Sequence, residues 1–172
     1  MSILVTGVAG FIGMHTAESL LSQGHHVVGI DNMNNYYDPR LKEERLNQLK
    51  HFNNFSFMKL DFAVQSFFEK FINTYTDIDH VIHLGAQAGV RNSIKEPHDY
   101  MNSNLAGQLN ILEYCRKLME RNNNFKKLIY ASSSSVYGAN AKTPFSVHDK
   151  TDHPGSFYGA TKKACEIMTQ SY

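Results

Sequence analysis

A tyrosine and a lysine four positions apart, Tyr158 and Lys162, are the residues of this sequence best suited to proton transfer. Spacing of four places both side chains on one face of a helix. A free phenol, with a pKa of about 10, is a poor base at neutral pH, but an ammonium about 5 Å away favours phenolate by roughly 3 kcal/mol at an effective dielectric constant of about 20. The pair therefore predicts a general acid and base, with Tyr158 as the proton carrier.

Four serines, at residues 132–135, follow an apolar run at residues 127–131 and supply further hydroxyl groups. The run is typical of a buried strand, and Ser133, Ser134 and Ser135 come just beyond its carboxyl end. Ligands of parallel sheets bind at that edge, where a hydroxyl can hydrogen-bond the reacting oxygen opposite the tyrosine. A serine run alone is usually a loop, and the Tyr–Lys spacing alone is usually helix surface. Their occurrence in one chain favours an active site.

A glycine-rich turn near the amino end has the spacing of a phosphate-binding loop. Gly7, Gly10 and Gly13 lie between an apolar run and a helical pattern that starts at Phe11 and Ile12. The first glycine permits the tight turn, the second lets the backbone approach a pyrophosphate, and the third allows the helix to pack closely. Free N–H groups at the helix start, with the helix dipole, then bind the anion.

Two acidic residues that end strands predict the rest of a dinucleotide site. Asp31 follows Gly13 by 18 positions and can accept hydrogen bonds from both hydroxyls of an adenosine ribose, whereas it would repel a 2′-phosphate. Asn32 and Met33 follow it, not arginine, so the sequence favours NAD over NADP. Asp31 as a simple turn residue is the weaker alternative. Asp61 can accept from the adenine amino group, and a helix N-cap is its equally good alternative.

The elements that must position these residues alternate along the chain. Short apolar runs predict five strands, at residues 3–6, 26–31, 55–60, 80–84 and 127–131. Amphipathic spacing predicts five helices, at residues 11–22, 39–52, 65–75, 99–121 and 156–172, with a polar turn at 122–124. Strands that are apolar on both faces and separated by helices indicate an α/β fold, a doubly wound parallel sheet covered on both sides.

Composition narrows the class of protein. The 172 residues suit one domain, and 17 basic against 16 acidic residues argue against a nucleic-acid partner. The densest basic cluster, residues 40–50, is interleaved with glutamates and reads as a solvated helix face. No apolar run is long enough to predict a membrane span, and the chain starts directly in a strand without the features of a signal peptide. Cys115 and Cys165 show no metal or disulfide spacing, which predicts no metal site and a reduced, cytoplasmic protein.

Taken together, these motifs resemble the extended short-chain dehydrogenases/reductases, the NAD-dependent epimerase/dehydratase family. The matching stretches are GVAGFIG, Asp31, HLGAQAG, SSSSVYG and YGATK, and they run from residue 2 to residue 172. Two stretches, residues 31–46 and 83–93, are similar to UDP-glucuronate 4-epimerases, although Gly85 and Asn92 stand where that group would have alanine and tyrosine. The resemblance implies a Rossmann-type NAD-binding domain over residues 1–172.

The resemblance also implies roles for individual residues. Adenosine and pyrophosphate contacts are implied for Gly7, Gly10, Phe11, Ile12, Gly13, Asp31, Asn32, Asp61 and Phe62. Contacts on the nicotinamide side are implied for Leu84, Gly85, Ala86, Gln87 and, through the ribose, Lys162. Sugar contacts are implied for Gln87, Arg91, Ser133, Ser134, Ser135 and Tyr158. Ser133, Tyr158 and Lys162 form the implied catalytic set. Arg91 has an equally good alternative as a solvated side chain.

The implied reaction is 4-epimerisation of a nucleotide sugar, UDP-glucuronate, through a 4-keto intermediate. Dehydratases of the family carry an acidic pair where this chain has Ser134 and Ser135, which favours an epimerase. The alternatives are another NAD-dependent epimerase or dehydratase, or an inactive NAD-binding module. Family members are longer, so we expect this chain to be the cofactor-binding and catalytic part, without the C-terminal substrate domain. A homodimer is implied through the helices at 99–121 and 156–172.

Overall fold

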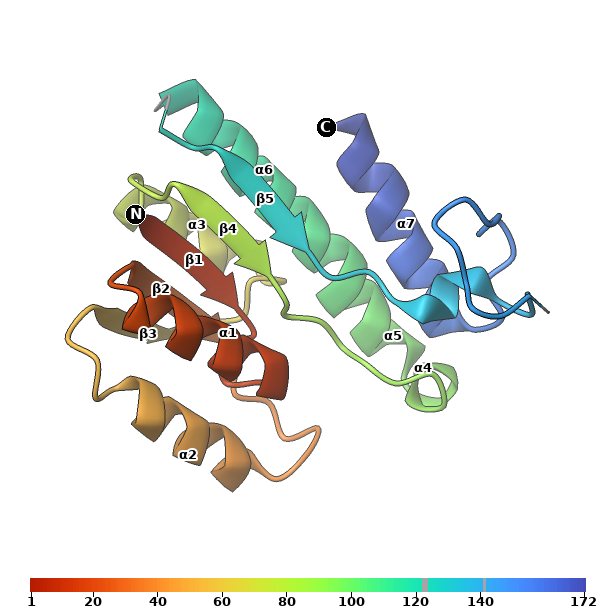
Figure 1. Ribbon diagram of the computed structural model, residues 1–172, viewed down its shortest axis with the longest axis horizontal. Helices are drawn as coiled ribbons and strands as arrows, with labels where there is room; N and C mark the ends of the chain where they lie inside the picture. The colour runs from red at the N-terminus through yellow and green to blue at the C-terminus, as the bar shows by residue number, and fades with distance from the viewer. Residues whose placement is uncertain (122–123, 141) are drawn as a thin grey trace. The chain divides into compact units, whose positions relative to one another are not determined.

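A five-stranded parallel sheet organises the fold in the computed structural model, which describes residues 1–121, 124–140 and 142–172. The strands are β1 (Ser2–Thr6), β2 (His26–Asp31), β3 (Phe55–Lys59), β4 (His80–His83) and β5 (Lys127–Tyr130), in the order β3-β2-β1-β4-β5 (Figure 1). All four strand pairs are parallel. This order reverses direction between β1 and β4, which confirms the predicted doubly wound, Rossmann-type sheet. Residues 122 and 123 of the predicted turn lie outside the described residues.

The chain divides into two compact units. The first comprises residues 1–85 and 113–130 and contains the whole sheet. The second comprises residues 86–112 and 131–172 and is helical apart from its loops.

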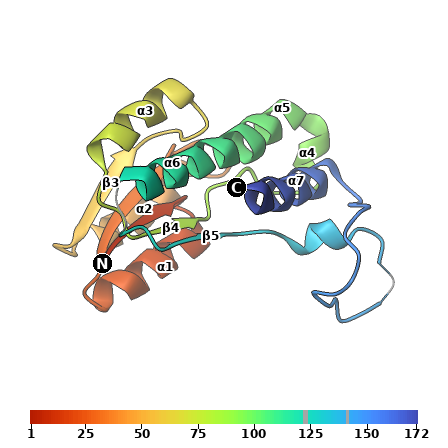
Figure 2. The same cartoon turned by 90° about the horizontal axis from the view of Figure 1, so that it is seen from above.

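Helices cover both faces of the sheet in the first unit. On one face, α1 (Phe11–Ser22) and α2 (Pro39–Leu49) bury an apolar cluster against β1 and β2. On the other, α3 (Gln65–Thr74) places Phe68 and Phe71 against the ring of Tyr114, at centroid distances of 5.7 and 5.6 Å. Figure 2 shows α1 and α3 on opposite sides of the sheet. Strands buried on both faces explain why their sequences are apolar runs and not alternating patterns.

The second unit departs in one element from the sequence-based expectation. The helix predicted at 99–121 is wrong in detail, because the helical run starts as α5 (Pro97–Tyr100), continues through a π-helical segment (Met101–Ala106) and becomes α6 (Gly107–Arg121). Pro97 sets the start, since proline is tolerated in the first turn of a helix. Residues 107–112 of α6 belong to this unit.

The helix predicted at 156–172 is confirmed as α7 (Phe157–Ser171). Ser156 is its N-cap, and the Ser156 hydroxyl accepts a hydrogen bond from the Gly159 N–H at 3.0 Å. Such caps satisfy N–H groups that the helix itself leaves free. The short helix α4 (Asn92–Lys95) and a 3₁₀ turn (Ser134–Tyr137) complete this unit. Within the described residues no helix is long and apolar enough to cross a membrane.

Candidate functional site

The glycine loop of the first unit is a turn that only glycine can make. Gly7 has a φ of +67°, and an added Cβ would lie 2.8 Å from the Gly85 backbone. A Cβ at Gly13 would lie 2.1 Å from the Gly7 carbonyl oxygen, so α1 begins in direct contact with the loop. Gly10, the N-cap of α1, provides no side-chain cap, and the side chains of Phe11 and Ile12 are exposed. The N–H groups at the start of α1 therefore have no side chain competing with an anion.

Asp31 ends β2 beside this loop, as predicted. Its Oδ2 accepts from the Ala9 N–H at 3.2 Å, and its Oδ1 accepts from the Met33 N–H at 2.8 Å. The second bond closes a local turn, in which Met33 has a φ of +56°. Asp31 is thus a turn residue and also faces the phosphate loop. A carboxylate has about four acceptor positions, and these two bonds, with a third from the Lys42 ammonium at 3.3 Å, leave about one for a ligand.

The structure confirms a solvated face for most of the basic cluster at 40–50, where Arg40 and Lys50 are exposed, but it contradicts that prediction at Lys42. Lys42 is 5% exposed, and its ammonium lies 3.3 Å from Asp31 Oδ1 and 2.9 Å from Asn34 Oδ1. The burial follows from the helix spacing, because Lys42 shares one face of α2 with the buried Leu46 and Leu49. The spacing of Lys42 from Leu46 and Leu49 in the sequence could have indicated this shared helix face. Lys42 was not among the predicted site residues.

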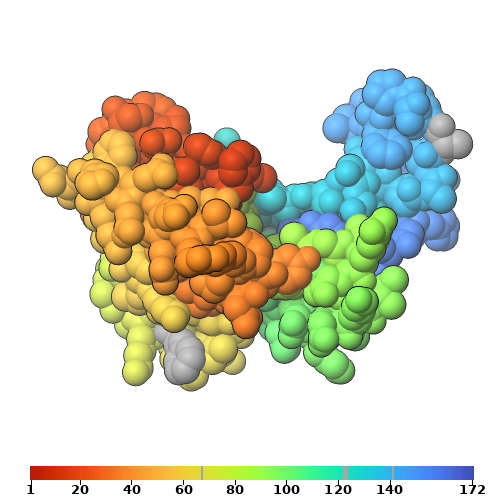
Figure 3. All heavy atoms as spheres, turned by 90° about the horizontal axis from the view of Figure 1, so that it is seen from below, coloured from red at the N-terminus to blue at the C-terminus, as the bar shows by residue number. Residues whose placement is uncertain are grey.

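The segment that contains Lys42 forms part of one surface of the first unit. Figure 3 shows the orange segment, which includes α2, continuous with α1 in red and with the yellow segment that includes α3. Arg45, one turn after Lys42, donates to the Ala9 carbonyl oxygen at 3.3 Å and to the Tyr37 hydroxyl at 3.0 Å. Both cations also lie over the Tyr37 ring, at 5.3 and 5.7 Å from its centroid. Two cations of α2 therefore flank the loop and Asp31.

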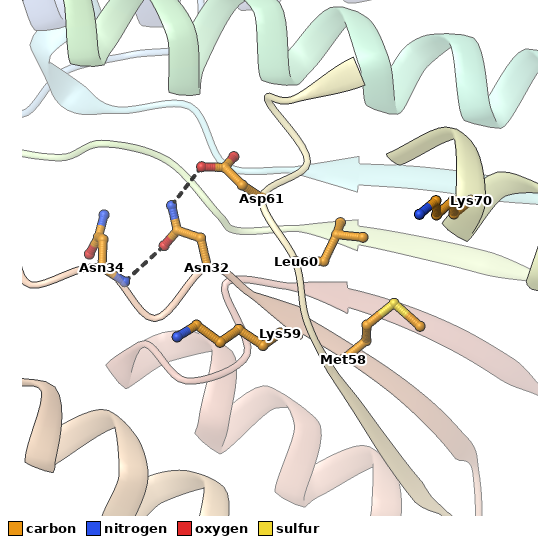
Figure 4. A pocket seen from close by; sticks show the side chains of 7 residues that line it. All are labelled: Asn32, Asn34, Met58, Lys59, Leu60, Asp61 and Lys70. Carbon is orange, nitrogen blue, oxygen red and sulfur yellow. Dashed lines mark hydrogen bonds between the residues drawn. The ribbon is translucent and has the colours of Figure 1, made fainter. Parts of the chain in front are cut away.

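An open pocket of about 720 Å³ lies at the carboxyl ends of β2 and β3. Seven residues line it: Asn32, Asn34, Met58, Lys59, Leu60, Asp61 and Lys70. Asn32 donates to Asp61 Oδ2 at 3.1 Å and accepts from the Asn34 N–H, and Figure 4 shows these polar groups facing one another beside Met58 and Leu60. An apolar wall with a polar rim suits a purine base. Asp61 is not the N-cap of α3, since that residue is Val64.

The residues after β4 explain one departure from the family pattern. The Gly85 N–H donates to the Thr6 hydroxyl at 3.0 Å, and a Cβ on Gly85 would lie 2.6 Å from the Phe62 ring. Phe62 is itself buried, edge-on to His83 at 5.0 Å. Glycine at position 85 in place of alanine therefore makes room for this ring. Leu84, next to it, is half-buried against the core cluster.

In the second unit, the buried Asn104 holds Gln87, the residue predicted to border the nicotinamide and the sugar. Asn104 was not among the predicted site residues. Asn104 accepts from the Gln87 N–H at 2.8 Å, donates to the Gln87 carbonyl at 3.1 Å and donates to Thr161 at 3.0 Å. It lies in the π-helical segment, a feature that often marks functional sites. Nothing in the local sequence indicates a π-helix there, because an ordinary helical pattern continues through it.

Tyr158 and Lys162 both lie on α7, and each is tied to another segment of the second unit. The Tyr158 N–H donates to the buried Ser93 hydroxyl at 3.1 Å, and the Tyr158 ring packs edge-on against Tyr100 at 6.1 Å. Lys162 is buried, with 7% of its surface exposed. Its ammonium donates a hydrogen bond to the Ala131 carbonyl oxygen at 2.9 Å. Burial lowers the pKa of Lys162, because the charged form loses hydration.

The serine run lies directly against α7. Ser133 is the N-cap of the 3₁₀ turn, its hydroxyl accepting from the Ser135 N–H at 3.2 Å. A Cβ on Gly159 would lie 2.6 Å from the Ser135 carbonyl oxygen, so α7 approaches this turn as closely as a glycine allows. Lys162 also binds Ala131, and the Ser132 hydroxyl donates to Glu166 of α7 at 2.6 Å, so three contacts join the helix of Tyr158 to the segment of Ser133. Arg91, just before α4, is exposed and has no ion-pair partner within the part of the chain that the structure describes.

The predicted residues thus fall into two groups. The first unit holds Gly7, Gly10, Phe11, Ile12, Gly13, Asp31, Asn32, Asp61, Phe62, Leu84 and Gly85. The second unit holds Ala86, Gln87, Arg91, Ser133, Ser134, Ser135, Tyr158 and Lys162. One unit therefore carries the groups that suit a dinucleotide, and the other carries the groups that suit proton transfer.

Comparison with known proteins finds relatives that match the whole chain. Protein CapI of Staphylococcus aureus is 48% identical over 173 residues, which cover all of this chain and 49% of CapI. UDP-glucuronate 4-epimerase 1 of Arabidopsis thaliana is 45% identical, again over the whole chain and over 39% of that protein. The crystal structure of UDP-glucuronic acid 4-epimerase from Bacillus cereus in complex with UDP-glucuronic acid and NAD matches with a TM-score of 0.88 and 34% identity, over 52% of its chain.

The chain spans about half the length, or less, of these curated relatives. A family model described as GDP-mannose 4,6 dehydratase matches residues 4–172, which is nearly the whole sequence. The chain therefore belongs to the GDP-mannose 4,6-dehydratase family of epimerases and dehydratases.

Proposed function

We propose that this chain is the cofactor-binding and catalytic part of an NAD-dependent nucleotide-sugar 4-epimerase acting on UDP-glucuronate. The observation that carries the proposal is the presence of Ser133, Tyr158 and Lys162 in one compact unit, with α7 attached to the serine segment through Ala131. Relatives named UDP-glucuronate 4-epimerase, and the Bacillus cereus enzyme with NAD and UDP-glucuronic acid, support the reaction and the substrate.

The residues of the first unit fit NAD. The uncapped start of α1, with glycines that leave no Cβ in the way, suits the pyrophosphate. The acceptor position that remains on Asp31 suits an adenosine ribose hydroxyl, and the pocket beside Asn32 and Asp61 suits adenine. When bound, NAD supplies a reversible hydride acceptor for carbon 4 of the sugar.

Tyr158 moves the proton in this proposal. As the phenolate, it takes the proton of the sugar 4-hydroxyl while that carbon is oxidised, and as the phenol it returns the proton when the ketone is reduced from the other face. Ser133 hydrogen-bonds the same oxygen, and the Lys162 ammonium favours the phenolate by its charge. The hydrogen bond from Lys162 to Ala131 holds that ammonium beside the serine segment. The atoms of the substrate are conserved, so the net reaction is an isomerisation.

Epimerisation is favoured over dehydration by the two residues that follow Ser133. Ser134 and Ser135 stand where dehydratases of the family carry an acidic pair, and a hydroxyl cannot replace a carboxyl group in removing water from the sugar. The name of the matching family model therefore describes the family and not the reaction that we assign here.

Arg91 and Gln87 are the residues that we assign to substrate recognition. Arg91 is exposed at the start of α4, and a guanidinium can bind a glucuronate carboxylate in a bidentate manner. We expect Arg91→Ala to reduce the preference for UDP-glucuronate over UDP-glucose. Unchanged discrimination between the two would support the solvated arginine instead.

A homodimer remains part of the proposal. Of the leucines on the helix predicted to pair, Leu112 and Leu118 are buried within the chain, whereas Leu109 is 42% exposed. Ile167 on α7 is 59% exposed. We expect these two exposed residues, and not the buried leucines, to contribute to any pairing through α6 and α7. Equilibrium sedimentation of the Leu109→Glu variant tests this.

Two measurements test the proposed function. The 172-residue chain should bind NAD in a 1:1 complex by calorimetry, although more weakly than the longer protein of which we propose it to be the front part. That longer protein should convert UDP-glucuronate into UDP-galacturonate, and Tyr158→Phe should abolish the conversion. Absence of NAD binding by the folded chain would refute the proposal. NAD binding with no reaction on any UDP-sugar would favour a non-catalytic dinucleotide-binding module, and formation of a 4-keto-6-deoxy sugar would favour a dehydratase.

A further inference from the structure

Asp31 and Lys42 form a buried ion pair at the predicted ribose site. The side chains of both residues are 6% exposed, and their charged atoms are 3.3 Å apart. An isolated carboxylate would reject a 2′-phosphate by charge alone. Paired with an ammonium, Asp31 contributes almost no net charge to the site, so simple repulsion does not account for a preference for NAD.

The contacts of Lys42 show what the pair does instead. The ammonium bridges Asp31, the predicted ribose acceptor, and Asn34, which lines the pocket beside it. With three donors, an ammonium bound to these two oxygens retains one further N–H. Arg45 adds a second cation, bound to the Ala9 carbonyl oxygen of the phosphate loop. Removing Asp31 would leave two cations beside an empty volume the size of a carboxylate.

We propose that Lys42 determines cofactor specificity together with Asp31, and that the two encode a latent NADP site. While Asp31 is present, Lys42 holds its carboxylate in place to accept from a ribose hydroxyl, and the carboxylate occupies the volume that a 2′-phosphate needs. When Asp31 is removed, the Lys42 ammonium becomes the ligand of that phosphate. This inference rests on the proposed NAD site and goes beyond it in assigning a residue of α2 to the choice between the two cofactors.

The experiment compares NADH and NADPH binding, by nicotinamide fluorescence, to five forms of the 172-residue chain. They are the wild type, Asp31→Ala, Lys42→Met, the double variant Asp31→Ala/Lys42→Met, and the control Lys50→Met, an exposed lysine at the end of the same helix. Circular dichroism confirms that each form is folded. The double variant contains no unpaired buried charge, so it stays informative even where Lys42→Met alone is unstable.

We expect the wild type and the control to prefer NADH. Asp31→Ala should gain affinity for NADPH by at least about tenfold, the effect of one charge-assisted hydrogen bond, and the double variant should lose that gain. An equal gain in NADPH affinity for Asp31→Ala and the double variant, or no gain in either, would overturn the assignment of Lys42. A folded wild-type chain that binds neither cofactor would instead refute the proposed function. The comparison among the variants tests only the role of Lys42.

Discussion

Replacing Lys42 by methionine should destabilise the protein far more than replacing an exposed lysine. Methionine is close to the lysine stem in volume, so the change mainly removes the charge and leaves the Asp31 carboxylate buried without its partner. At the 3.3 Å separation of this pair, and an effective dielectric constant of about 20, the lost attraction is about 5 kcal/mol. Breaking one side of a buried ion pair typically costs about 3–5 kcal/mol, and we expect Lys42→Met to fall in that range.

A double-mutant cycle separates this attraction from simple loss of packing. Asp31→Asn should cost a similar amount, because the buried ammonium is then left with only Asn34. The double variant Asp31→Asn/Lys42→Met contains a neutral pair, and we expect it to lie within about 2 kcal/mol of the wild type, since neutral replacements of buried pairs are often tolerated. The single costs therefore should not add, and the coupling energy should exceed about 2 kcal/mol.

Urea denaturation of the four forms, followed by circular dichroism, measures these free energies of unfolding. Lys50→Met is the matched control on the same helix and should lie within about 0.5 kcal/mol of the wild type, as is usual for exposed substitutions. The reasoning would be refuted if each single variant lost less than about 1 kcal/mol of unfolding free energy. It would also be refuted if the losses of the two single variants added up in the double variant, because independent losses mean that the two charges do not interact.

Three further predictions concern other parts of the chain. Lys162→Met should keep or raise the stability at pH 7 while it abolishes epimerisation, because burial lowers the pKa of Lys162 and the charged form costs folding energy. The unfolded chain binds more protons at this lysine, so the stability of the wild type relative to Lys162→Met should rise with pH up to about 10.5, the ordinary pKa of lysine; a stability difference that does not change with pH would contradict it. Burial raises the pKa of Cys115 to about 12, so thiol reagents at pH 8 should label it only after unfolding, and rapid labelling of the folded chain would be the contrary result. Ser93→Ala removes the acceptor of the Tyr158 N–H and should cost about 1 kcal/mol, measured by urea denaturation, with no loss as the contrary result.

The sheet and its phosphate loop were predictable because local chemistry determines them. Gly7 and Gly13 occupy positions where a side chain has no room, and Asp31 ends a strand that is apolar throughout. The contact of Gly13 with Gly7 and the 18 positions from Gly13 to Asp31 join residues that are near in sequence, and the doubly wound arrangement then follows from the handedness of parallel crossovers. The boundaries of the predicted elements differ from the observed ones by a few residues at most, but the π-helical segment within the helix at 99–121 and the short helix α4 were not predicted.

The remaining site features depend on contacts that sequence spacing does not reveal. Lys42 looks like one more surface cation until its helix face is compared with Leu46 and Leu49, and its partner is 11 positions away on a strand. Asn104 acts through Thr161 and the backbone of Gln87, which tertiary packing alone brings to it. The π-helical turn that carries Asn104 has no sequence pattern of its own.

Transfer of the carbon-4 hydrogen most directly tests the central claim, that a hydride leaves and returns to the same carbon while Tyr158 moves the proton. The longer protein would be supplied with UDP-glucuronate deuterated at carbon 4, and the product analysed by NMR. The account predicts UDP-galacturonate that retains deuterium at carbon 4, formed by the wild type and not by Tyr158→Phe. A product carrying solvent hydrogen at that carbon would contradict hydride transfer and with it the assigned mechanism.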